Sequence, residues 1–525
     1  MVQRHLRRRG RARDRGLDID DRFTEAVAHH RAGRLDRAAE GYTKVLRQRP
    51  DHAAALSMTG VLALQRGQPA DAVPPLVRAT MLDPAQPGYF LNLGNALRGC
   101  DRMMEAEQAY RRALDLEPAM APAHNNLGNV LRDQGALPEA AATYARALEL
   151  QPEFFAAAAN LAQVLARLDD TPRADVQVAY ERALAIAEQT GRRDPDVANL
   201  HNARGNLLHA AGRATDAIEA YREAVAIDPK FFEAHINLAQ AYARELQLSL
   251  AVESLRAAIA LRPDELAPYK RLALALRRLQ RNDEATAVYR AWHERDPDDP
   301  IAAHMANVGE VEPPDRASDE YVAREFDEFA DNFEAVLLDK LDYQAPRLVA
   351  AALGRAGLST RDDLEVLDAG CGTGLCAGFL RPLAGRLTGV DLSGKMLDKA
   401  RARASYDVLL EAELRAFLGA HPEAFDVVVA ADVLLYFGRL EELTAAIRCA
   451  LRPGGVAVFT VEGGPETPRG WSLGEGGRYT HHPRYLRSVL QAAGLTVSEM
   501  VEEQLRLELG EPVMGWVVTA TAPPT

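Results

Sequence analysis

The sequence contains no apolar run near the roughly 18 residues that a membrane-spanning helix requires, and only four of its 525 residues are cysteine. These cysteines are Cys100, Cys371, Cys376 and Cys449, which form no C-x-x-C pair and have no histidine at metal-ligand spacing. We therefore expect no metal site and no membrane partner. Reduced thiols in a cytoplasmic protein are the expected state.

The first fifteen residues lack an apolar segment after their basic cluster, which excludes a secretory signal peptide. Seven of them are arginine and one is Asp14. We expect residues 1–18 to form a disordered basic tail, with an organelle presequence or a nucleic-acid-binding arm as alternatives. Removing this segment's net charge of +6 from the total of −13 leaves −19, so the remainder repels phosphate backbones and no nucleic-acid partner is expected.

Prolines in the first half recur every 34 residues, at Pro50, Pro84, Pro118 and Pro152, and again at Pro229, Pro263 and Pro297. Alanine stands twelve residues before each proline, and tyrosine or leucine stands eight residues before it. A small residue where two helices cross, followed one turn later by a large one, suits a packed helix pair. The period is that of the tetratricopeptide repeat.

Between Pro152 and Pro229 the interval is 77 residues, which equals one standard repeat plus one of 43. We interpret the longer unit as a fifth repeat whose second helix or loop is stretched near residues 190–195. About eight repeats then occupy residues 19–300. Such an array is expected to form an all-α solenoid, a right-handed superhelix with a concave groove.

Four asparagines share one position of the repeat: Asn92, Asn126, Asn160 and Asn237. Amides on the concave side can bind an extended peptide backbone through one donor and one acceptor each. The segments NLGNAL and NNLGNVL resemble repeats of the O-linked N-acetylglucosamine transferases, in which such a ladder holds extended polypeptide. The resemblance predicts a protein or peptide in the groove. The alternative is that these amides satisfy neighbouring helices within the solenoid.

A polar stretch at residues 301–320 leaves the repeat register, and we interpret it as a linker to a second domain at residues 321–525. The next stretch, Tyr321–Leu353, is amphipathic, with large apolar residues at helical spacing: Phe326, Phe329, Phe333, Leu337, Leu338 and Leu341. Seven strands are then predicted, at Leu364–Ala369, Arg386–Asp391, Val408–Glu413, Asp426–Ala431, Gly455–Val461, Leu495–Leu505 and Val513–Thr521. Helices fit between most of them, which indicates an α/β Rossmann-like domain whose last two strands form a hairpin.

The run Val366–Leu375 reads as a buried strand that breaks into a glycine loop, D-x-G-x-G-x-G, and opens a helix. Asp391 ends the next strand. In a doubly wound sheet, such a loop lets a ligand lie against bare backbone, and the acid on the neighbouring strand can bind both ribose hydroxyls. The leading acid, Asp368, repels a pyrophosphate but suits an ammonium group. Spacing alone also allows a dinucleotide fingerprint in the frame Gly372, Gly374, Ala377.

Residues from about 315 to 525 resemble class I S-adenosylmethionine-dependent methyltransferases, and this resemblance implies the cofactor. Gly370, Gly372 and Gly374 would approach its methionyl and ribose groups, Asp368 would bind the ammonium, and Asp391 the ribose diol. Leu392 and Met396 would pack on the adenine, and Glu413, next to Leu414, would contact its amine. In this family a helix at the position of residues 321–353 covers the cofactor.

The segment Ala431-Asp432-Val433-Leu434-Leu435-Tyr436-Phe437 lacks the D/N-P-P-Y/F signature of methylases that act on amide or exocyclic amino nitrogens. It resembles instead small-molecule and miscellaneous protein methyltransferases, including a subset with preceding tetratricopeptide repeats. Methyl transfer requires alignment of the nucleophile, and a base only if the nucleophile carries a proton. Asp432, Tyr436 and Glu462 are candidates to face the methyl group. His481 or His482, in the segment 478–482, is a candidate base, and an exposed loop pair is the alternative.

The leading hypothesis is a methyltransferase whose repeat groove selects a protein or protein-borne acceptor. A small-molecule methyltransferase with a partner-recruiting array is the second. The third is a scaffold that binds the cofactor without turnover.

Overall fold

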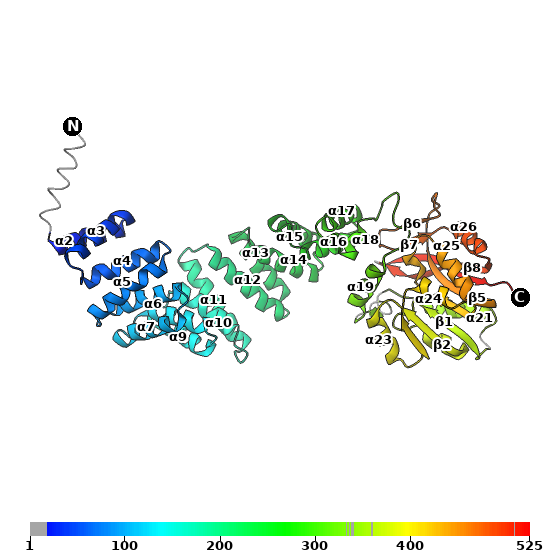
Figure 1. Ribbon diagram of the computed structural model, residues 1–525, viewed down its shortest axis with the longest axis horizontal. Helices are drawn as coiled ribbons and strands as arrows, with labels where there is room; N and C mark the ends of the chain where they lie inside the picture. Colours follow the sequence, from blue (N-terminus) through cyan, green and yellow to red (C-terminus); the bar gives the residue numbers. More distant parts are fainter. Residues whose placement is uncertain are drawn as a thin grey trace, which may run out of the picture. The chain divides into compact units, whose positions relative to one another are not determined.

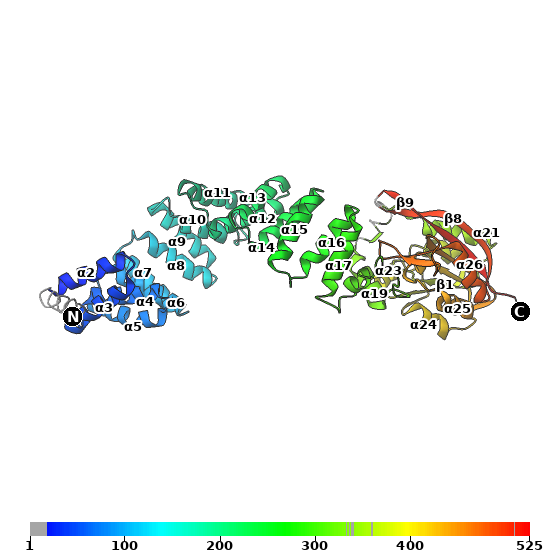
Figure 2. The same cartoon turned by 90° about the horizontal axis from the view of Figure 1, so that it is seen from above.

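The computed structural model describes residues 18–331, 333–334, 337, 341–358, 361–508 and 510–524. Residues 1–17 of the predicted basic tail, and Leu338 of the predicted amphipathic stretch, lie outside these ranges. The chain divides into two compact units, Met1–Glu245 and Leu246–Thr525. The division falls inside the repeat array (Figures 1 and 2).

The first unit consists of helix pairs, one pair per repeat. The pairs are α2 (Ile19–Arg31) with α3 (Leu35–Gln48), α4 (Ala53–Gln65) with α5 (Pro69–Leu82), α6 (Pro87–Gly99) with α7 (Met103–Leu116), α8 (Ala121–Asp133) with α9 (Leu137–Leu150), α10 (Phe155–Leu165) with α11 (Arg173–Gln189), and α12 (Pro195–Ala210) with α13 (Ala214–Ile227); α14 (Phe232–Arg244) follows. The periodic prolines follow the second helices, as Pro50 follows α3, because proline cannot continue a helix.

Four of the pairs pack a large side chain against the bare backbone of a glycine, at Gly60, Gly94, Gly128 and Gly205. Tyr110 and Tyr144 are fully buried, and a Cβ on Gly94 or Gly128 would lie 2.5 or 2.6 Å from the respective ring. Burial raises the pKa of both hydroxyls to about 12. The small-then-large spacing in the sequence is thus the packing rule of the array.

The fifth pair has a second helix of 17 residues, α11, whereas α7 and α9 have 14. The longer α11 lies in the repeat that the spacing of the prolines predicts to be stretched. The second unit continues the array with α15 (Leu248–Leu261), α16 (Ala267–Arg278) and α17 (Asn282–His293). The described helices thus form eight pairs. Within the predicted linker lies α18 (Pro300–Met305), followed by α19 (Asp319–Phe329) and α21 (Ala345–Arg355).

A mixed sheet forms the rest of the second unit. Its strands are β1 (Leu364–Ala369), β2 (Ala384–Asp391), β3 (Val408–Glu411), β4 (Phe425–Ala430), β5 (Leu451–Gly463), β6 (Trp471–Leu473), β7 (Tyr479–His481), β8 (Thr496–Glu508) and β9 (Glu511–Thr521). The order is β3-β2-β1-β4-β5-β7-β6, and β9 pairs with β5 and β8. All seven predicted strands are present, β8 and β9 form the antiparallel hairpin, and the α/β prediction is confirmed.

The two additional strands, β6 and β7, form a hairpin within the glycine-rich segment before the last helix. Strand β7 pairs with β5 at Glu462 and Gly463, beyond the point where β4 ends opposite Phe459. This hairpin therefore extends the sheet at the carboxyl edge of β4, where ligands of open α/β sheets bind.

Helices cover both faces of the sheet: α22 (Ala377–Leu380) and α21 on one face, and α24 (Leu414–Ala420), α25 (Glu441–Ala450) and α26 (Pro483–Ala492) on the other. Successive side chains of β1 point to opposite faces of the sheet: Val366 packs with α21 and α22, and Leu367 packs with α24 and α25. Helix α23 (Gly394–Ala402) follows β2. No described helix is both long and apolar enough to cross a membrane.

Candidate functional site

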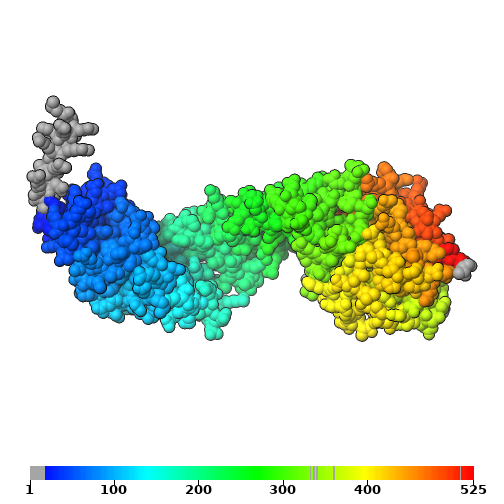
Figure 3. All heavy atoms as spheres, in the orientation of Figure 1, coloured from blue at the N-terminus to red at the C-terminus, as the bar shows by residue number. Residues whose placement is uncertain are grey.

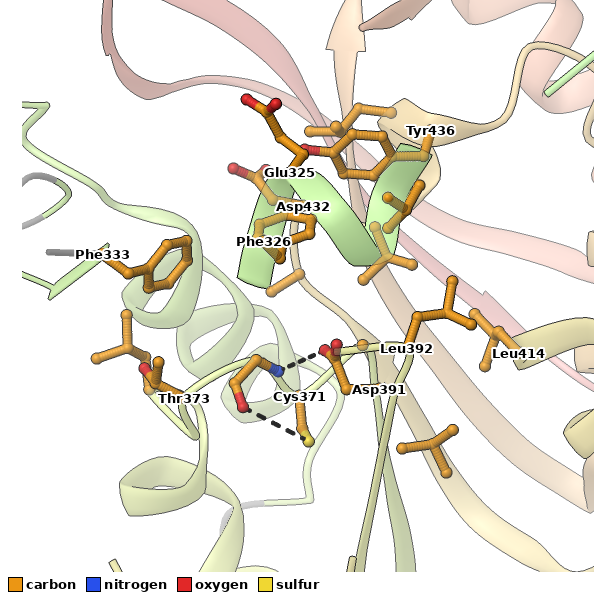
Figure 4. Close-up of a pocket in the computed structure, with 18 of the residues that line it drawn as sticks. Glu325, Phe326, Phe333, Cys371, Thr373, Asp391, Leu392, Leu414, Asp432 and Tyr436 are labelled. Atoms are coloured by element: carbon orange, nitrogen blue, oxygen red, sulfur yellow. Dashed lines mark hydrogen bonds between the residues drawn. The ribbon is translucent and has the colours of Figure 1, made fainter. Parts of the chain in front are cut away.

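A cavity opens at the carboxyl ends of β1, β2 and β4, where the predicted loop lies. It encloses about 1470 Å³ of empty space, its mouth included. The walls come from the glycine loop, from the segments after β2 and β4, from α19 and the residues that follow it, and from Arg478 and Arg506. Figure 4 shows Asp391 and Cys371 at one end, with Glu325, Asp432 and Tyr436 together at the other.

The loop requires glycine at its three predicted positions. Gly370, Gly372 and Gly374 have φ angles of +69°, +54° and +85°, which other residues rarely adopt. A Cβ on Gly370 would lie 2.3 Å from Val433, whereas the space beside Gly372 is open. Gly370 and Gly372 line the cavity; Gly374 instead faces Arg403 and Tyr406.

Asp391 is fixed by backbone donors at the end of β2. Its Oδ2 accepts from the N–H of Gly372 at 2.8 Å (Figure 4). Its Oδ1 accepts from the N–H of Ser393 at 2.9 Å. Burial raises the pKa of this carboxyl, although these hydrogen bonds oppose the shift. The carboxyl therefore ties the glycine loop to β2 at the cavity wall.

Asp368, at the head of the loop, is 1% exposed but lines the cavity. Its Oδ2 accepts a 2.6 Å hydrogen bond from the Tyr406 hydroxyl. Burial raises the pKa of Asp368 to about 7; the Tyr406 bond lowers it and the neighbouring Asp391 raises it. A carboxyl with that pKa gains a stable charge when a cation is placed beside it.

Three of the four remaining predicted cofactor residues, Leu392, Glu413 and Leu414, line the cavity. Met396, on α23, is fully buried and does not line the cavity. Glu413 caps α24 through a 2.8 Å hydrogen bond from the N–H of Ala416 and accepts from Arg316 at 3.1 Å. Burial raises the pKa of Glu413, but the backbone and arginine donors outweigh it and lower the pKa overall.

Helix α19 and the following residues form an aromatic wall. Phe326, Phe329 and Phe333 line the cavity, and the Phe326 ring lies edge-on to Tyr436 with centroids 5.6 Å apart. These rings also contact one another, with Phe326 and Phe329 each within 6 Å of Phe333. The predicted amphipathic stretch therefore both packs and faces the cavity.

Asp432 and Tyr436, the predicted acceptor-side residues, both line the opposite end. Asp432 has a φ of +55° directly after β4. Its N–H donates to Thr460 Oγ1 at 2.8 Å, and that hydroxyl donates to Asp432 Oδ1 at 3.0 Å. Burial raises the pKa of Asp432, while Arg506, 3.3 Å from Oδ2, opposes the shift.

A buried ionic network stands behind Asp432. Arg506, only 4% exposed, donates to Asp432 and to Glu462, and Arg478 donates to the same Glu462 oxygen at 2.8 Å. Glu462 and Arg478 lie in segments that the sequence singles out. Arg506, Tyr343 and Glu325 line the cavity but were not predicted. A register shift between Gln504 and Arg506 lets consecutive residues of β8, Leu505 and Arg506, both be buried.

The placement of His481 does not support the predicted general base. The side chain is fully buried on β7, outside the cavity wall, with Nε2 3.0 Å from the carbonyl oxygen of Gly438. Burial lowers its pKa to about 4, so the ring binds a proton poorly near neutral pH. His482 instead caps α26, accepting from the N–H of Arg484.

The predicted asparagine ladder connects neighbouring repeats. Asn126 donates to Asn95 at 2.8 Å, Asn160 donates to Asn125 and Asn129, and Asn237 donates to Asn202 and Asn206. Asn92 donates to Ser57 at 3.4 Å. The amide nitrogens thus bind neighbouring helices within the solenoid, as the alternative interpretation of the asparagines predicts.

Comparisons with protein families agree with this division of the chain. Residues 367–459 match the model described as "Methyltransferase domain". Residues 23–88, 91–153 and 236–300 match "Tetratricopeptide repeat", and residues 205–245 match "TPR repeat".

The chain is similar over about a quarter of its length to curated methyltransferases. It is 33% identical over 119 residues to malonyl-[acyl-carrier protein] O-methyltransferase of Enterobacter lignolyticus, which is 22% of this chain and 47% of that protein. It is 30% identical to trans-aconitate 2-methyltransferase of Paracidovorax citrulli, over 26% of this chain and 53% of that protein. The chain thus spans about half the length of these relatives.

Among solved structures, MamA is 25% identical, with a TM-score of 0.30, over 33% of this chain and 98% of MamA. The family matches, the repeat packing and the glycine loop at the carboxyl edge of the sheet agree with one another. The chain combines tetratricopeptide repeats with a Rossmann-like methyltransferase domain.

Proposed function

We propose that the chain is an S-adenosylmethionine-dependent methyltransferase that methylates a protein or protein-borne acceptor selected by the repeat groove. The observation that carries this proposal is the glycine loop: three glycines with positive φ stand between Asp368 and Asp391, and two of them, Gly370 and Gly372, line the same cavity as both acids. A dinucleotide is a poorer fit, since Asp368 would repel a pyrophosphate.

The residues present fit the cofactor. Asp368, whose pKa of about 7 reflects burial without a cationic partner, would hold its ammonium group, and Asp391 its ribose diol. Bare backbone at Gly370 and Gly372 allows close approach, while Leu392, Leu414 and the Glu413 carboxylate would surround the adenine. When bound, the cofactor supplies an electrophilic methyl group on a sulfonium.

The protein's part in the transfer is alignment and exclusion of water. Phe326, Phe329 and Phe333 cover the cavity, and their faces and that of Tyr436 suit a cationic sulfonium. Asp432 and Tyr436 would orient the acceptor. Asp432, whose pKa burial raises, is the group there that can take a proton from a nucleophile that carries one.

The protein-borne acceptor draws support from two sources. Tetratricopeptide arrays commonly bind polypeptide segments in their grooves, and the relative from Enterobacter lignolyticus is named for an acceptor carried by a protein. A small-molecule acceptor is the second candidate, because other relatives are named for trans-aconitate and for ubiquinone biosynthesis.

Calorimetry with S-adenosylmethionine, followed by labelling of a cell lysate with its methyl-tritiated form, tests the proposal. Asp391→Asn should abolish or strongly weaken binding, while Asp398→Asn, at an exposed acid of the adjacent α23, should not. Labelled protein bands would support a protein acceptor, and labelled extractable small molecules the second candidate. Binding without labelled product in any fraction would overturn the enzymatic proposal.

A further inference from the structure

The last repeat contacts the methyltransferase domain through charged side chains of α16. Lys270 pairs with Glu328 of α19, and Arg277 Nη2 lies 3.9 Å from Glu508 Oε1 of β8. Lys270 and Arg277 are seven residues apart and therefore share one face of the helix. In the space-filling view, the green atoms of the last repeats lie directly against the orange atoms of the sheet domain (Figure 3).

The repeat register explains how Arg277 is held. In α8, Asn129 accepts from the hydroxyl of Tyr144 at 2.8 Å. The corresponding pair in the last repeat is Leu274 and Tyr289, since both stand 145 residues later. Leu274 offers no hydrogen-bond acceptor, and the group near the Tyr289 hydroxyl is Arg277, which lowers the pKa that burial raises. The tyrosine that binds an amide in the fourth repeat therefore lies beside a cation in the last one.

Arg277 ends a chain of alternating charges that begins at the cavity. The order is Asp432, Arg506, Glu462, Arg478, Glu508 and Arg277, each in contact with the next. The methyltransferase domain supplies three acids and two arginines, a net charge of −1, and Arg277 brings the network to zero. Buried charges are costly unless balanced, and Arg277 adds the balancing charge at the outer, partly exposed end of the network.

The same face of α16 acts on Glu325, an acceptor-side residue of α19 that lines the cavity. Burial raises the pKa of Glu325, and Lys270 and then Arg277 are the largest opposing influences. The charged and titratable groups that face Glu325 are Lys270, Arg277, Tyr289, Tyr321, Glu328, Tyr436 and Arg478. Three cations therefore act on Glu325, and two of them, Lys270 and Arg277, come from the last repeat.

The repeat array also holds the loop that carries Arg478. His304 of α18 stacks on Tyr321 with centroids 4.0 Å apart, and its Nε2 lies 2.8 Å from the carbonyl oxygen of Gly477. Asn282 of α17 contacts Glu475 in the same loop. The loop before Arg478 is therefore attached to α18 through Gly477 and to the last repeat through Glu475.

We propose that α16 completes the acceptor end of the cavity, with Lys270 and Arg277 as positioning residues that hold Glu325 and Arg478 in a balanced ionic arrangement. The last repeat then belongs to the catalytic site, whereas the preceding repeats serve recognition. This inference rests on the proposed methyl transfer.

Full-length variants test it with three measurements: affinity for S-adenosylmethionine by calorimetry, the pH profile of methyl-tritium transfer to the acceptor fraction, and titration of Glu325. The last uses NMR of protein labelled with ¹³C at the glutamate carboxyl, with Glu325→Gln for assignment. The variants are Arg277→Gln, Arg277→Lys, Lys270→Gln and the double variant Arg277→Gln/Glu508→Gln. Arg271→Gln, at an exposed cation of the same helix, is the control.

Arg277→Gln should leave cofactor affinity unchanged and lower kcat/KM for the acceptor roughly tenfold, an ordinary magnitude for coupled sites. The acidic limb of the pH profile of methyl transfer should move to higher pH in this variant, because removal of a cation raises the pKa of Glu325. Arg277→Lys should retain most activity, and Glu508→Gln should partly rescue Arg277→Gln by restoring the charge balance.

A wild-type pH profile and wild-type Glu325 titration in Arg277→Gln would overturn the inference. Equal losses in Arg277→Lys and in the double variant would overturn it too, since a purely structural role predicts no rescue. If the wild-type protein binds cofactor but transfers nothing, the proposed function fails. The Glu325 titration still decides the inference about α16, because its pKa must rise in Arg277→Gln and Lys270→Gln.

Discussion

Helices α8 and α16 are the first helices of their repeats and share one register, but they make opposite kinds of contact. In α8, Asn125, Asn126 and Asn129 belong to a neutral network that links neighbouring repeats. In α16 the same positions are Lys270, Arg271 and Leu274, and the contacts are ionic. The repeat framework is thus constant, while its joint with the catalytic domain is charged.

This difference has energetic consequences. Burial of an amide side chain on folding has a modest desolvation cost, and the amide does not titrate. The ladder therefore stabilises the array independently of pH. A buried ionic network contributes to the stability of the fold only while every charge is balanced. Removing one charged side chain leaves another buried charge without a partner. The second unit should therefore be sensitive to single charge changes and to pH, and the amide ladder of the first unit insensitive to both.

The largest effect is expected from Arg506→Gln. This substitution leaves Asp432 and Glu462 buried beside one fewer cation and should destabilise the second unit by about 3–5 kcal/mol. Hydrogen exchange of the full-length protein should show lost protection in β8 and β9 with unchanged protection in α8. Arg452→Gln, at a more exposed ion pair with Asp426, should cost about 0–1 kcal/mol. Equal effects of the two variants would show that burial does not set the cost, and lost protection in α8 would remove the distinction between the units.

A second effect concerns pH and the cofactor. Because burial raises the pKa of Asp368 to about 7, the folded protein binds more protons than the unfolded chain between about pH 4 and pH 7. This contribution to stability is present at low pH and is lost as pH rises towards 7. Cofactor binding has the opposite dependence, since an ammonium group requires the carboxylate.

Calorimetry should therefore show the Kd for S-adenosylmethionine falling roughly tenfold from about pH 6 to pH 7.5, with proton release at the lower pH. Buffers of different ionisation enthalpy report the released proton. Asp368→Asn should remove the proton release, and Asp398→Asn should keep it. A Kd that does not change with pH in the wild-type protein would contradict the assignment of Asp368.

The array and the strands were predictable because their signals are local and periodic. Repeat spacing, the alanine and tyrosine positions, and the strand before Gly370 each report a contact that the neighbouring sequence determines. The stretched fifth repeat followed from the same arithmetic. The glycine loop and Asp391 were predictable for the same reason, since positive φ and a strand end leave marks in the sequence.

The remaining site residues depend on contacts between distant segments. Arg506 enters the cavity wall because of a register shift in β8, and Tyr406 reaches Asp368 across 38 positions of the chain. His481 has a typical base side chain, but the β6–β7 hairpin buries it away from the cavity. None of these placements has a signal in composition or spacing.

A smaller effect is expected when the amide ladder is shortened. Asn126→Ala removes the 2.8 Å donor to Asn95 and should cost about 0.5–1.5 kcal/mol of stability in the first unit. Hydrogen exchange of α6 and α8 measures it, with Gln151→Ala, at an exposed amide, as control.

Partner capture by an Asn92→Ala/Asn126→Ala variant tests the groove separately, and unchanged capture would refute its use of these amides.

The smallest effect on stability, and the sharpest test of the comparison, is Leu274→Asn, which restores to α16 the amide position of α8. Leu274 is 46% exposed, so stability should change by no more than about 0.5 kcal/mol. The new amide should accept from the Tyr289 hydroxyl, as Asn129 accepts from Tyr144, and should compete with Arg277 for the space beside that hydroxyl.

The pKa of Glu325 should then rise, but by less than in Arg277→Gln, because the guanidinium stays in place and is only held less firmly. Leu250→Asn on α15, at a leucine of similar exposure, controls for the added polarity. If both leucine variants leave the Glu325 titration unchanged, Tyr289 does not orient Arg277. A shift confined to Leu274→Asn would mean that one repeat position, amide or leucine, determines whether a helix pair serves the array or the catalytic cavity.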